Sequence, residues 1–163
     1  MKEVEFEDIS IEHANEIMEI FNYYAVNTFA AYPEKSLPNE FLYKIIELSK
    51  GYPAYTIIFQ KKIVGFCLLR AYNPFAVFRE TAEISYFISN NFIGKGLGKI
   101  ALTKLETEAK KLGIKTILAS ITSENIQSIE FHKRNSFIEC GRFPETGKKF
   151  GKTFDIIWMS KKL

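Results

Sequence analysis

The sequence predicts an α/β fold in which helices cover both faces of a mixed sheet. Short aromatic and β-branched runs alternate with amphipathic helical patterns along the chain. A glycine-rich turn links one such run to a long helix, and no linker, repeat or low-complexity tract divides the sequence. With 163 residues, 47% of them hydrophobic, the chain is expected to form one domain spanning residues 1–163.

The first half is expected to hold a strand, two helices and a hairpin. Ser10 is a suitable N-cap for the first helix, with His13 at the capping-box position, and prolines mark the loop after that helix. The expected elements are a strand at 4–9, a helix to about Val26, a helix from near Phe41 that is broken at Gly51-Tyr52-Pro53, and a hairpin of 54–60 and 63–72 turning at Lys61-Lys62.

The second half is expected to alternate strands and helices. The helix after the glycine turn places Leu97, Ala101, Leu105, Ala109 and Leu112 on one apolar face, and Gly113 is its C-cap. The other expected elements are a strand around Glu83, a strand at 116–121, a short helix at 126–134, and terminal strands near 137–142 and 153–159.

The glycine-rich turn is the strongest functional signal. Its glycines alternate and two lysines accompany them (Gly94, Lys95, Gly96, Gly98, Lys99). A strand, such a turn and a helix N-terminus direct several backbone N–H groups at one point, which suits a phosphate or pyrophosphate. The spacing matches neither the P-loop nor the dinucleotide-binding fingerprint. The alternative is a flexible turn without a ligand.

The hexad Ile93-Gly94-Lys95-Gly96-Leu97-Gly98 resembles the [QR]-x-x-G-x-[GA] signature of the GCN5-related N-acetyltransferase (GNAT) superfamily, with Ile93 in place of Gln or Arg. Further segments resemble the phosphinothricin acetyltransferase-like branch in the same order. These segments are 27–33, 63–66, 81–85, 125–137 and 147–155. The resemblance therefore covers nearly the whole chain.

This resemblance implies a GNAT-type, mostly antiparallel sheet and an acetyl-CoA-dependent N-acetyltransferase. The implied acceptor is the primary amine of a small molecule, such as an amino acid or a phosphinothricin- or methionine-sulfoximine-like compound, and the implied assembly is a homodimer. Two alternatives stay open: acetylation of protein N-termini or lysines, and a non-catalytic acyl-CoA-binding sensor domain.

The resemblance also implies roles for individual residues. Glu83 is the expected general base, because apolar neighbours on its strand make a carboxylate a better proton acceptor. His132 stands where many acetyltransferases have a tyrosine that protonates the leaving thiolate; the alternative is a structural histidine packed beside Phe131 and Phe137. The expected cofactor-binding residues are Phe87, Ile88, Ile93, Gly94, Lys95, Gly96, Leu97, Gly98, Lys99, Asn125 and Ser128.

The acceptor pocket is expected to involve aromatic residues and one arginine that suits a carboxylate. The residues are Phe29, Tyr32, Tyr72, Phe75 and Arg79. With 15% aromatic residues in the chain, the aromatic candidates also suit the core or a subunit interface.

Composition excludes several classes of function. The net charge of +3 is mild and no basic block appears, so we expect no nucleic-acid partner. Neither the two cysteines nor the two histidines have metal-site spacing, so no metal is expected. The first residues lack the apolar core of a signal peptide, and no apolar run approaches the ~18 residues of a membrane span. We therefore expect a cytoplasmic protein without a membrane partner.

Overall fold

A computed structural model describes residues 3–163, so the first two residues of the expected domain lie outside it. Seven strands form one sheet in the order β1-β2-β3-β4-β5-β7-β6. Only β4 and β5 pair in parallel within the described chain. The strands are β1 (Val4–Asp8), β2 (Ala54–Phe59), β3 (Lys62–Ala71), β4 (Thr81–Ile88), β5 (Thr116–Thr122), β6 (Ile138–Lys149) and β7 (Lys152–Lys162). The predicted mixed, mostly antiparallel sheet is confirmed.

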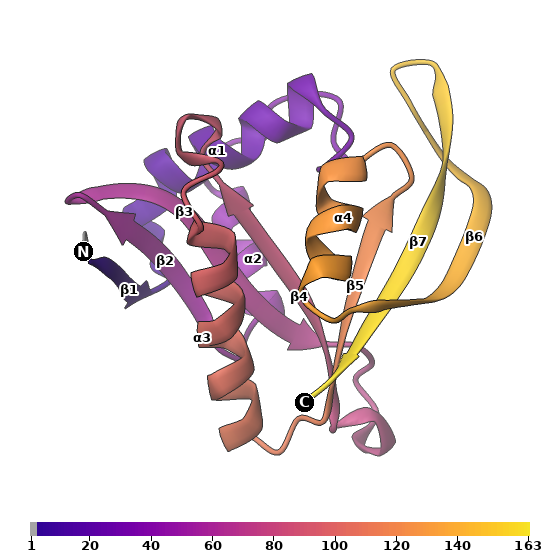
Figure 1. Cartoon of the computed structure of the whole chain (residues 1–163). Helices are drawn as coiled ribbons and strands as arrows, with labels where there is room; N and C mark the ends of the chain where they lie inside the picture. Colours follow the sequence, from indigo (N-terminus) through magenta and orange to yellow (C-terminus); the bar gives the residue numbers. More distant parts are fainter. Residues whose placement is uncertain (1–2) are drawn as a thin grey trace.

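Helices lie on both faces of this sheet, as predicted (Figure 1). The first pair packs on one face and the second pair on the other. The α-helices are α1 (Ala14–Asn27), α2 (Phe41–Leu48), α3 (Leu97–Lys111) and α4 (Ile126–Arg134), and the short 3-10 turns are η1 (Ile11–His13), η2 (Ala76–Phe78) and η3 (Asn90–Phe92).

Local capping sets the ends of the helices. The Ser10 hydroxyl accepts from the Glu12 N–H, which confirms the predicted N-cap, whereas the His13 ring contacts Thr56 instead of completing a capping box. At the end of α3, Gly113 adopts φ +76°, and Ile114 N–H donates to the Ala109 carbonyl. This is a Schellman cap, so the predicted C-cap role of Gly113 is confirmed.

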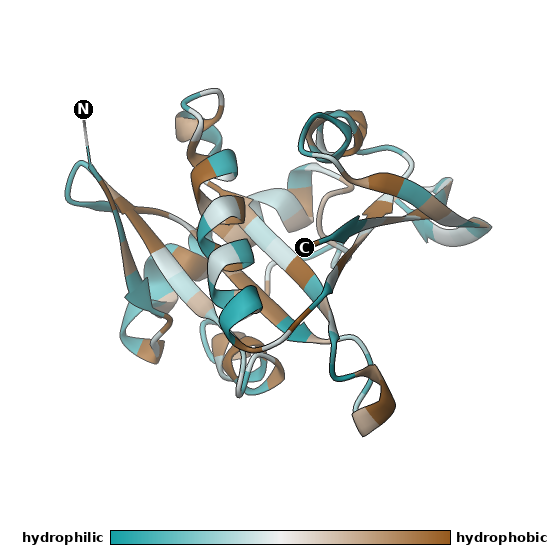
Figure 2. Cartoon of the chain, turned by 60° about the horizontal axis from the view of Figure 1, so that its bottom comes forward, coloured by the Kyte–Doolittle hydropathy of each residue, from teal (hydrophilic) through white to brown (hydrophobic). Residues whose placement is uncertain are grey.

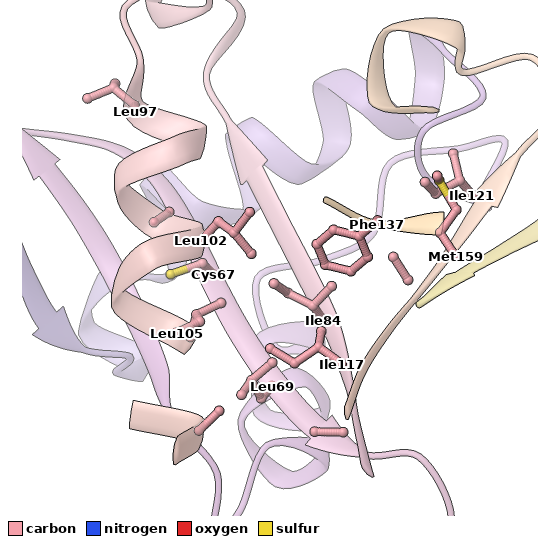
Figure 3. Packing of buried hydrophobic residues seen from close by; sticks show 14 of the residues in the cluster. Cys67, Leu69, Ile84, Leu97, Leu102, Leu105, Ile117, Ile121, Phe137 and Met159 are labelled. Carbon is pink, nitrogen blue, oxygen red and sulfur yellow. The ribbon is translucent and has the colours of Figure 1, made fainter. Parts of the chain in front are cut away.

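The larger core cluster lies between the sheet and the α3/α4 layer. Leu102 and Leu105 of α3 face Cys67 and Leu69 of β3, with Ile84 of β4 beside them (Figure 3). The smaller cluster joins α1 and α2 to the other face of β3. Helices thus pack against both faces of β3 and β4. These two strands are therefore well supported where their side chains extend beyond the core.

Two turns and one helix face differ from the predictions. The β2–β3 hairpin turns at Gln60-Lys61, one residue earlier than expected, because these two residues adopt the positive φ angles of a type I′ turn. The terminal strands are longer than expected and extend to a turn at Phe150-Gly151. As an edge strand, β6 accommodates Pro144 and two register shifts. Leu112, expected on the buried face of α3, is 54% exposed.

Hydrophobic bands alternate with hydrophilic ones along the strands and helices (Figure 2). A hydrophobic turn, η2, projects away from the sheet at the lower right of this view. Phe75, directly before η2, and Val77, within it, are both exposed. Among residues 3–163, no helix has the length and apolar character needed to traverse a bilayer.

Candidate active site

The sheet opens between β4 and β5. Their parallel pairing covers Thr81–Glu83 against Thr116–Leu118, and beyond Glu83 no pairing between them is present in the described residues. Figure 1 shows the two strands separating toward the ends that carry α3 and α4. A split of this kind leaves main-chain donors and acceptors on both inner edges without strand partners, which suits an extended ligand that carries amides.

Strand register identifies the main-chain groups that face this split. Ser89 N–H donates to the Val64 carbonyl on β3, and main-chain groups alternate sides along a strand. Phe87 therefore directs its main chain at β3, whereas Tyr86 and Ile88 direct theirs into the split. The Tyr24 hydroxyl of α1 donates to the Ile88 carbonyl at 2.5 Å. Of the two expected main-chain partners, Ile88 but not Phe87 faces the split.

The glycine turn stands at the open end of this split. Gly94 and Gly96 adopt φ values of +79° and +78°, and Gly96 is the N-cap of α3. A Cβ at either glycine would meet no atom within 4 Å, so the turn borders open space. The N-terminus of a 15-residue helix and bare backbone at this position fit the pyrophosphate of a nucleotide cofactor.

A cavity of about 730 Å³ runs from the glycine turn through the split to the face that carries α1 and α2. Most of the predicted site residues line it together. They are Tyr32, Glu83, Phe87, Ile88, Ile93, Gly94, Gly96, Leu97, Gly98, Lys99, Asn125, Ser128 and His132. Lys95 does not line the cavity; its ammonium lies 6.0 Å from the centre of the Phe92 ring.

Glu83 lies where β4 and β5 begin to separate. It is 8% exposed, and its Oε1 is 2.8 Å from Nη2 of Arg70 on β3. The Ser120 hydroxyl of β5 is 3.5 Å from the same oxygen, and the Tyr32 hydroxyl is 3.4 Å from Ser120. Glu83, Arg70, Ser120 and Tyr32 thus form one polar cluster in the cavity. The main partners of Glu83 are therefore polar, and not the apolar neighbours on its own strand that the sequence suggested.

His132 is 3% exposed and is held at both ring nitrogens. Nδ1 is 2.7 Å from the Ser128 carbonyl, which accepts its proton, so Nε2 accepts the Tyr86 hydroxyl at 2.5 Å. Burial lowers the pKa of His132 and raises the pKa of Tyr86 well above its usual range. In this tautomer the neutral ring has no proton to give at Nε2, because that nitrogen accepts the only proton of the Tyr86 hydroxyl. The role of His132 as the acid therefore stays a prediction.

Because His132 is buried, we expect the free energy of unfolding to fall in mild acid. Burial lowers the pKa of His132 in the folded protein, so as the pH falls below the ordinary pKa of 6.5 the unfolded chain binds a proton more readily than the folded protein does. The stability associated with the neutral His132 ring is fully present above pH 6.5 and is lost as the pH falls below it. Urea unfolding at pH 7.5 and 5.5 should show a drop in the free energy of unfolding for wild type that is smaller in His132→Gln. An equal drop in both proteins would contradict the assignment.

Asn125 begins α4. Its side-chain oxygen accepts the Ser128 N–H at 3.2 Å, so the residue is the N-cap of that helix. The α4 helix meets the glycine turn closely, because a Cβ at Gly98 would lie 3.4 Å from the Phe131 ring. Asn125 and Ser128 therefore line the cavity from a helix that is itself fixed against the start of α3.

Four of the five expected acceptor residues lie outside the cavity of this single chain. Phe29 packs against Phe150 and Phe154. Tyr72 packs on Phe78 and Trp158, whereas Phe75 and Arg79 lie exposed beside η2. The aromatic residues near η2 therefore lie apart from the cavity that Tyr32 lines.

The loop that carries Tyr32 is clamped by the β6–β7 hairpin. The buried Lys149 ammonium donates to the carbonyls of Ala25, Thr28 and Ala31 at 2.6, 2.6 and 2.5 Å. Phe150 N–H also donates to the Glu34 carboxylate at 2.7 Å. These contacts fix residues 28–34 over the cavity that Glu83 lines.

Sequence reasoning missed Arg70, Ser120 and Tyr86. Arg70 had a detectable signal, because it is a charge placed directly after the buried apolar run Val64–Leu69. Ser120 and Tyr86 had none, since both lie in ordinary strand sequence and their partners come from other elements. No group of three or more His, Cys, Asp or Glu residues that could hold a metal occurs in the described part of the chain.

Comparisons with known proteins agree with this geometry. The family model described as Acetyltransferase (GNAT) family matches residues 17–137. The chain is 28% identical over 149 residues to the L-amino acid N-acyltransferase MnaT of Escherichia coli, and 31% identical over 150 residues to the L-methionine sulfoximine/L-methionine sulfone acetyltransferase of Pseudomonas aeruginosa. Each alignment covers 90% of this chain and 87% of the relative.

A solved structure of a GNAT superfamily phosphinothricin acetyltransferase from Sinorhizobium meliloti, in complex with AcCoA, superposes with a TM-score of 0.90. It is 25% identical, and the match covers 98% of this chain and 88% of that one. The expected fold thus matches that of a solved acetyltransferase over nearly the whole chain. The chain therefore belongs to the acetyltransferase (GNAT) family.

Proposed function

We propose that this acetyltransferase transfers the acetyl group of acetyl-CoA to the α-amine of a small amino acid or a close analogue, such as phosphinothricin or methionine sulfoximine. Acetyl-CoA is the cosubstrate, as in the S. meliloti structure. The observation that carries the proposal is the position of Glu83 at the start of the split, in one cavity with the glycine turn. The names of the two relatives support the acceptor class.

Glu83 acts as the general base in this proposal. The neutral amine attacks the thioester carbonyl carbon, its proton passes to the Glu83 carboxylate, the C–S bond breaks, and CoA leaves as a thiol after gaining a proton. Unpaired main-chain N–H groups along the split supply donors for the oxyanion. The departing thiolate takes its proton from water, because the Tyr86 hydroxyl donates its single proton to His132 Nε2.

The glycine turn supplies cofactor affinity rather than chemistry. Gly96→Ala should raise the KM for acetyl-CoA by about 10-fold or more, because a Cβ strains the left-handed backbone and displaces the N–H groups that face the pyrophosphate. Gly113→Ala is the matched control: Gly113 has φ +76° at the other end of α3, away from the cavity. Equal KM values for the two variants would refute the cofactor role of this turn.

A panel of acceptors tests the proposed function. Thiol release from acetyl-CoA is measured with free amino acids, phosphinothricin, methionine sulfoximine, amines without a carboxylate, and short peptides. Efficient acetylation of free amino acids or their analogues supports the proposal. Preference for peptides would instead favour the protein acetyltransferase alternative, and acetyl-CoA binding without turnover would favour a sensor domain.

We also propose a homodimer formed through the aromatic surface near η2. Phe75, Val77 and Phe143 are 72%, 84% and 53% exposed, and Tyr72 and Phe78 extend this surface. Apolar exposure of this kind is typical of an interface. Sedimentation equilibrium should give the mass of two chains; a monomer at micromolar concentration would contradict the proposal. A cytoplasmic location stays a prediction from the sequence.

A further inference from the structure

Arg70 is a charged residue in the cavity that the reaction scheme above does not use. It stands directly opposite Glu83 in the β3–β4 register and lines the same cavity. Its side chain keeps 35% of its surface exposed, compared with 10% for Glu83. A guanidinium carries five N–H donors, and the contact with Glu83 uses one of its two terminal nitrogens. Arg70 therefore keeps N–H donors that the contact with Glu83 does not use, on a partly exposed side chain that lines the cavity.

We propose that Arg70 binds the α-carboxylate of the acceptor while Glu83 receives the proton of its α-amine. This inference rests on the proposed function and names the residue that selects the acceptor. In an α-amino acid the amine nitrogen and the carboxylate carbon are both bonded to Cα, so they lie about 2.5 Å apart. Arg70 Nη2 and Glu83 Oε1 are in direct contact at 2.8 Å, so the two groups are near enough for one acceptor to reach Glu83 with its amine and Arg70 with its carboxylate.

Electrostatics favours the same pairing. A cavity containing Glu83 alone would repel an acceptor that carries a carboxylate, and the adjacent guanidinium offsets this repulsion. Arginine also binds carboxylates through two parallel N–H bonds, which fixes the orientation of the acceptor as well as its affinity. The pair Arg70–Glu83 is thus complementary to a zwitterion, with Ser120 and Tyr32 adding neutral donors beside it.

A simpler role for Arg70 would be to orient Glu83, and kinetics separate the two roles. An arginine that binds the carboxylate contributes only to acceptors that carry one, so its loss raises KM for these acceptors. An arginine that only orients the base contributes to every acceptor alike, so its loss lowers kcat for all of them.

The test compares an amino acid with its primary amide as acceptors for wild type, Arg70→Gln and Arg70→Lys. Arg70→Gln should raise KM for the amino acid by about 10- to 100-fold, with the amide KM changed by less than about 3-fold. Arg70→Lys should fall between wild type and Arg70→Gln for the amino acid, because it keeps the charge and loses the planar fork. Thermal unfolding confirms that each variant is folded.

Arg79→Gln is the comparison variant, because Arg79 is the arginine that the sequence offers as a carboxylate partner, and it lies exposed near η2. A selective KM increase in this variant instead of Arg70→Gln would overturn the inference. An equal loss for amino acid and amide in Arg70→Gln would also overturn it, while leaving the proposed function intact. Wild-type turnover of the amide but not of the amino acid would overturn both.

Discussion

Glu83→Gln is expected to lower kcat by about 10²- to 10⁴-fold while leaving the affinity for acetyl-CoA unchanged. Glutamine keeps the size and one oxygen of the glutamate, so it can still face Arg70 and Ser120. It has no basic oxygen that can take the amine proton. The loss should therefore appear in the chemical step rather than in either binding step.

Two measurements separate these effects. Initial rates of thiol release give kcat, and isothermal titration with acetyl-CoA gives the cofactor affinity. Glu80→Gln is the matched control, because Glu80 precedes the same strand and its carboxylate pairs with Lys115 at the exposed surface. Turnover of Glu83→Gln within about 3-fold of this control would rule out Glu83 as the base.

Lys149→Met should destabilise the fold by roughly 3 kcal/mol, which corresponds to a fall in Tm of about 6–12 °C. Methionine fills the space of the lysine stem but donates no hydrogen bond. The carbonyls of Ala25, Thr28 and Ala31 would lose their shared donor at a buried site, and each unsatisfied acceptor costs about 1 kcal/mol or more.

The neighbouring Lys148 supplies the control for this prediction, since its side chain is exposed on the same strand. Lys148→Met should leave Tm within about 2 °C of wild type. If the two variants unfold at the same temperature, the Lys149 ammonium does not hold the loop in place. A secondary effect is expected on KM for the acceptor, because the released loop carries Tyr32.

The sequence predicted features that depend on local pattern. The order of the elements, the caps at Ser10 and Gly113 and the turn at Gly94–Gly98 all follow from residue types at fixed spacing. Glu83 belongs to the strand that leads directly into that turn, and its role as the base, which the family resemblance implies, stays a prediction. Motifs of this kind combine backbone conformation and chemistry in one short segment, so a single segment suffices to find them.

The sequence could not predict contacts that depend on register and packing. Arg70 reaches Glu83 only because β3 and β4 pair with these two residues opposite each other. The neutral tautomer of His132 depends on Tyr86 from another element, and the clamp at Lys149 joins residues more than 100 positions apart. The placement of the aromatic acceptor candidates could not be predicted for the same reason, because aromatic side chains suit a core, a pocket and an interface alike.

A competition assay tests the central claim most directly. One reaction contains acetyl-CoA, methionine sulfoximine, its decarboxylated amine and a short peptide with a free N-terminus at equal concentrations, and mass spectrometry follows the acetylated products. The account predicts that acetylated methionine sulfoximine forms first and dominates, and that Glu83→Gln abolishes it. Dominant acetylation of the peptide or of the decarboxylated amine would contradict an enzyme built for small amino acids.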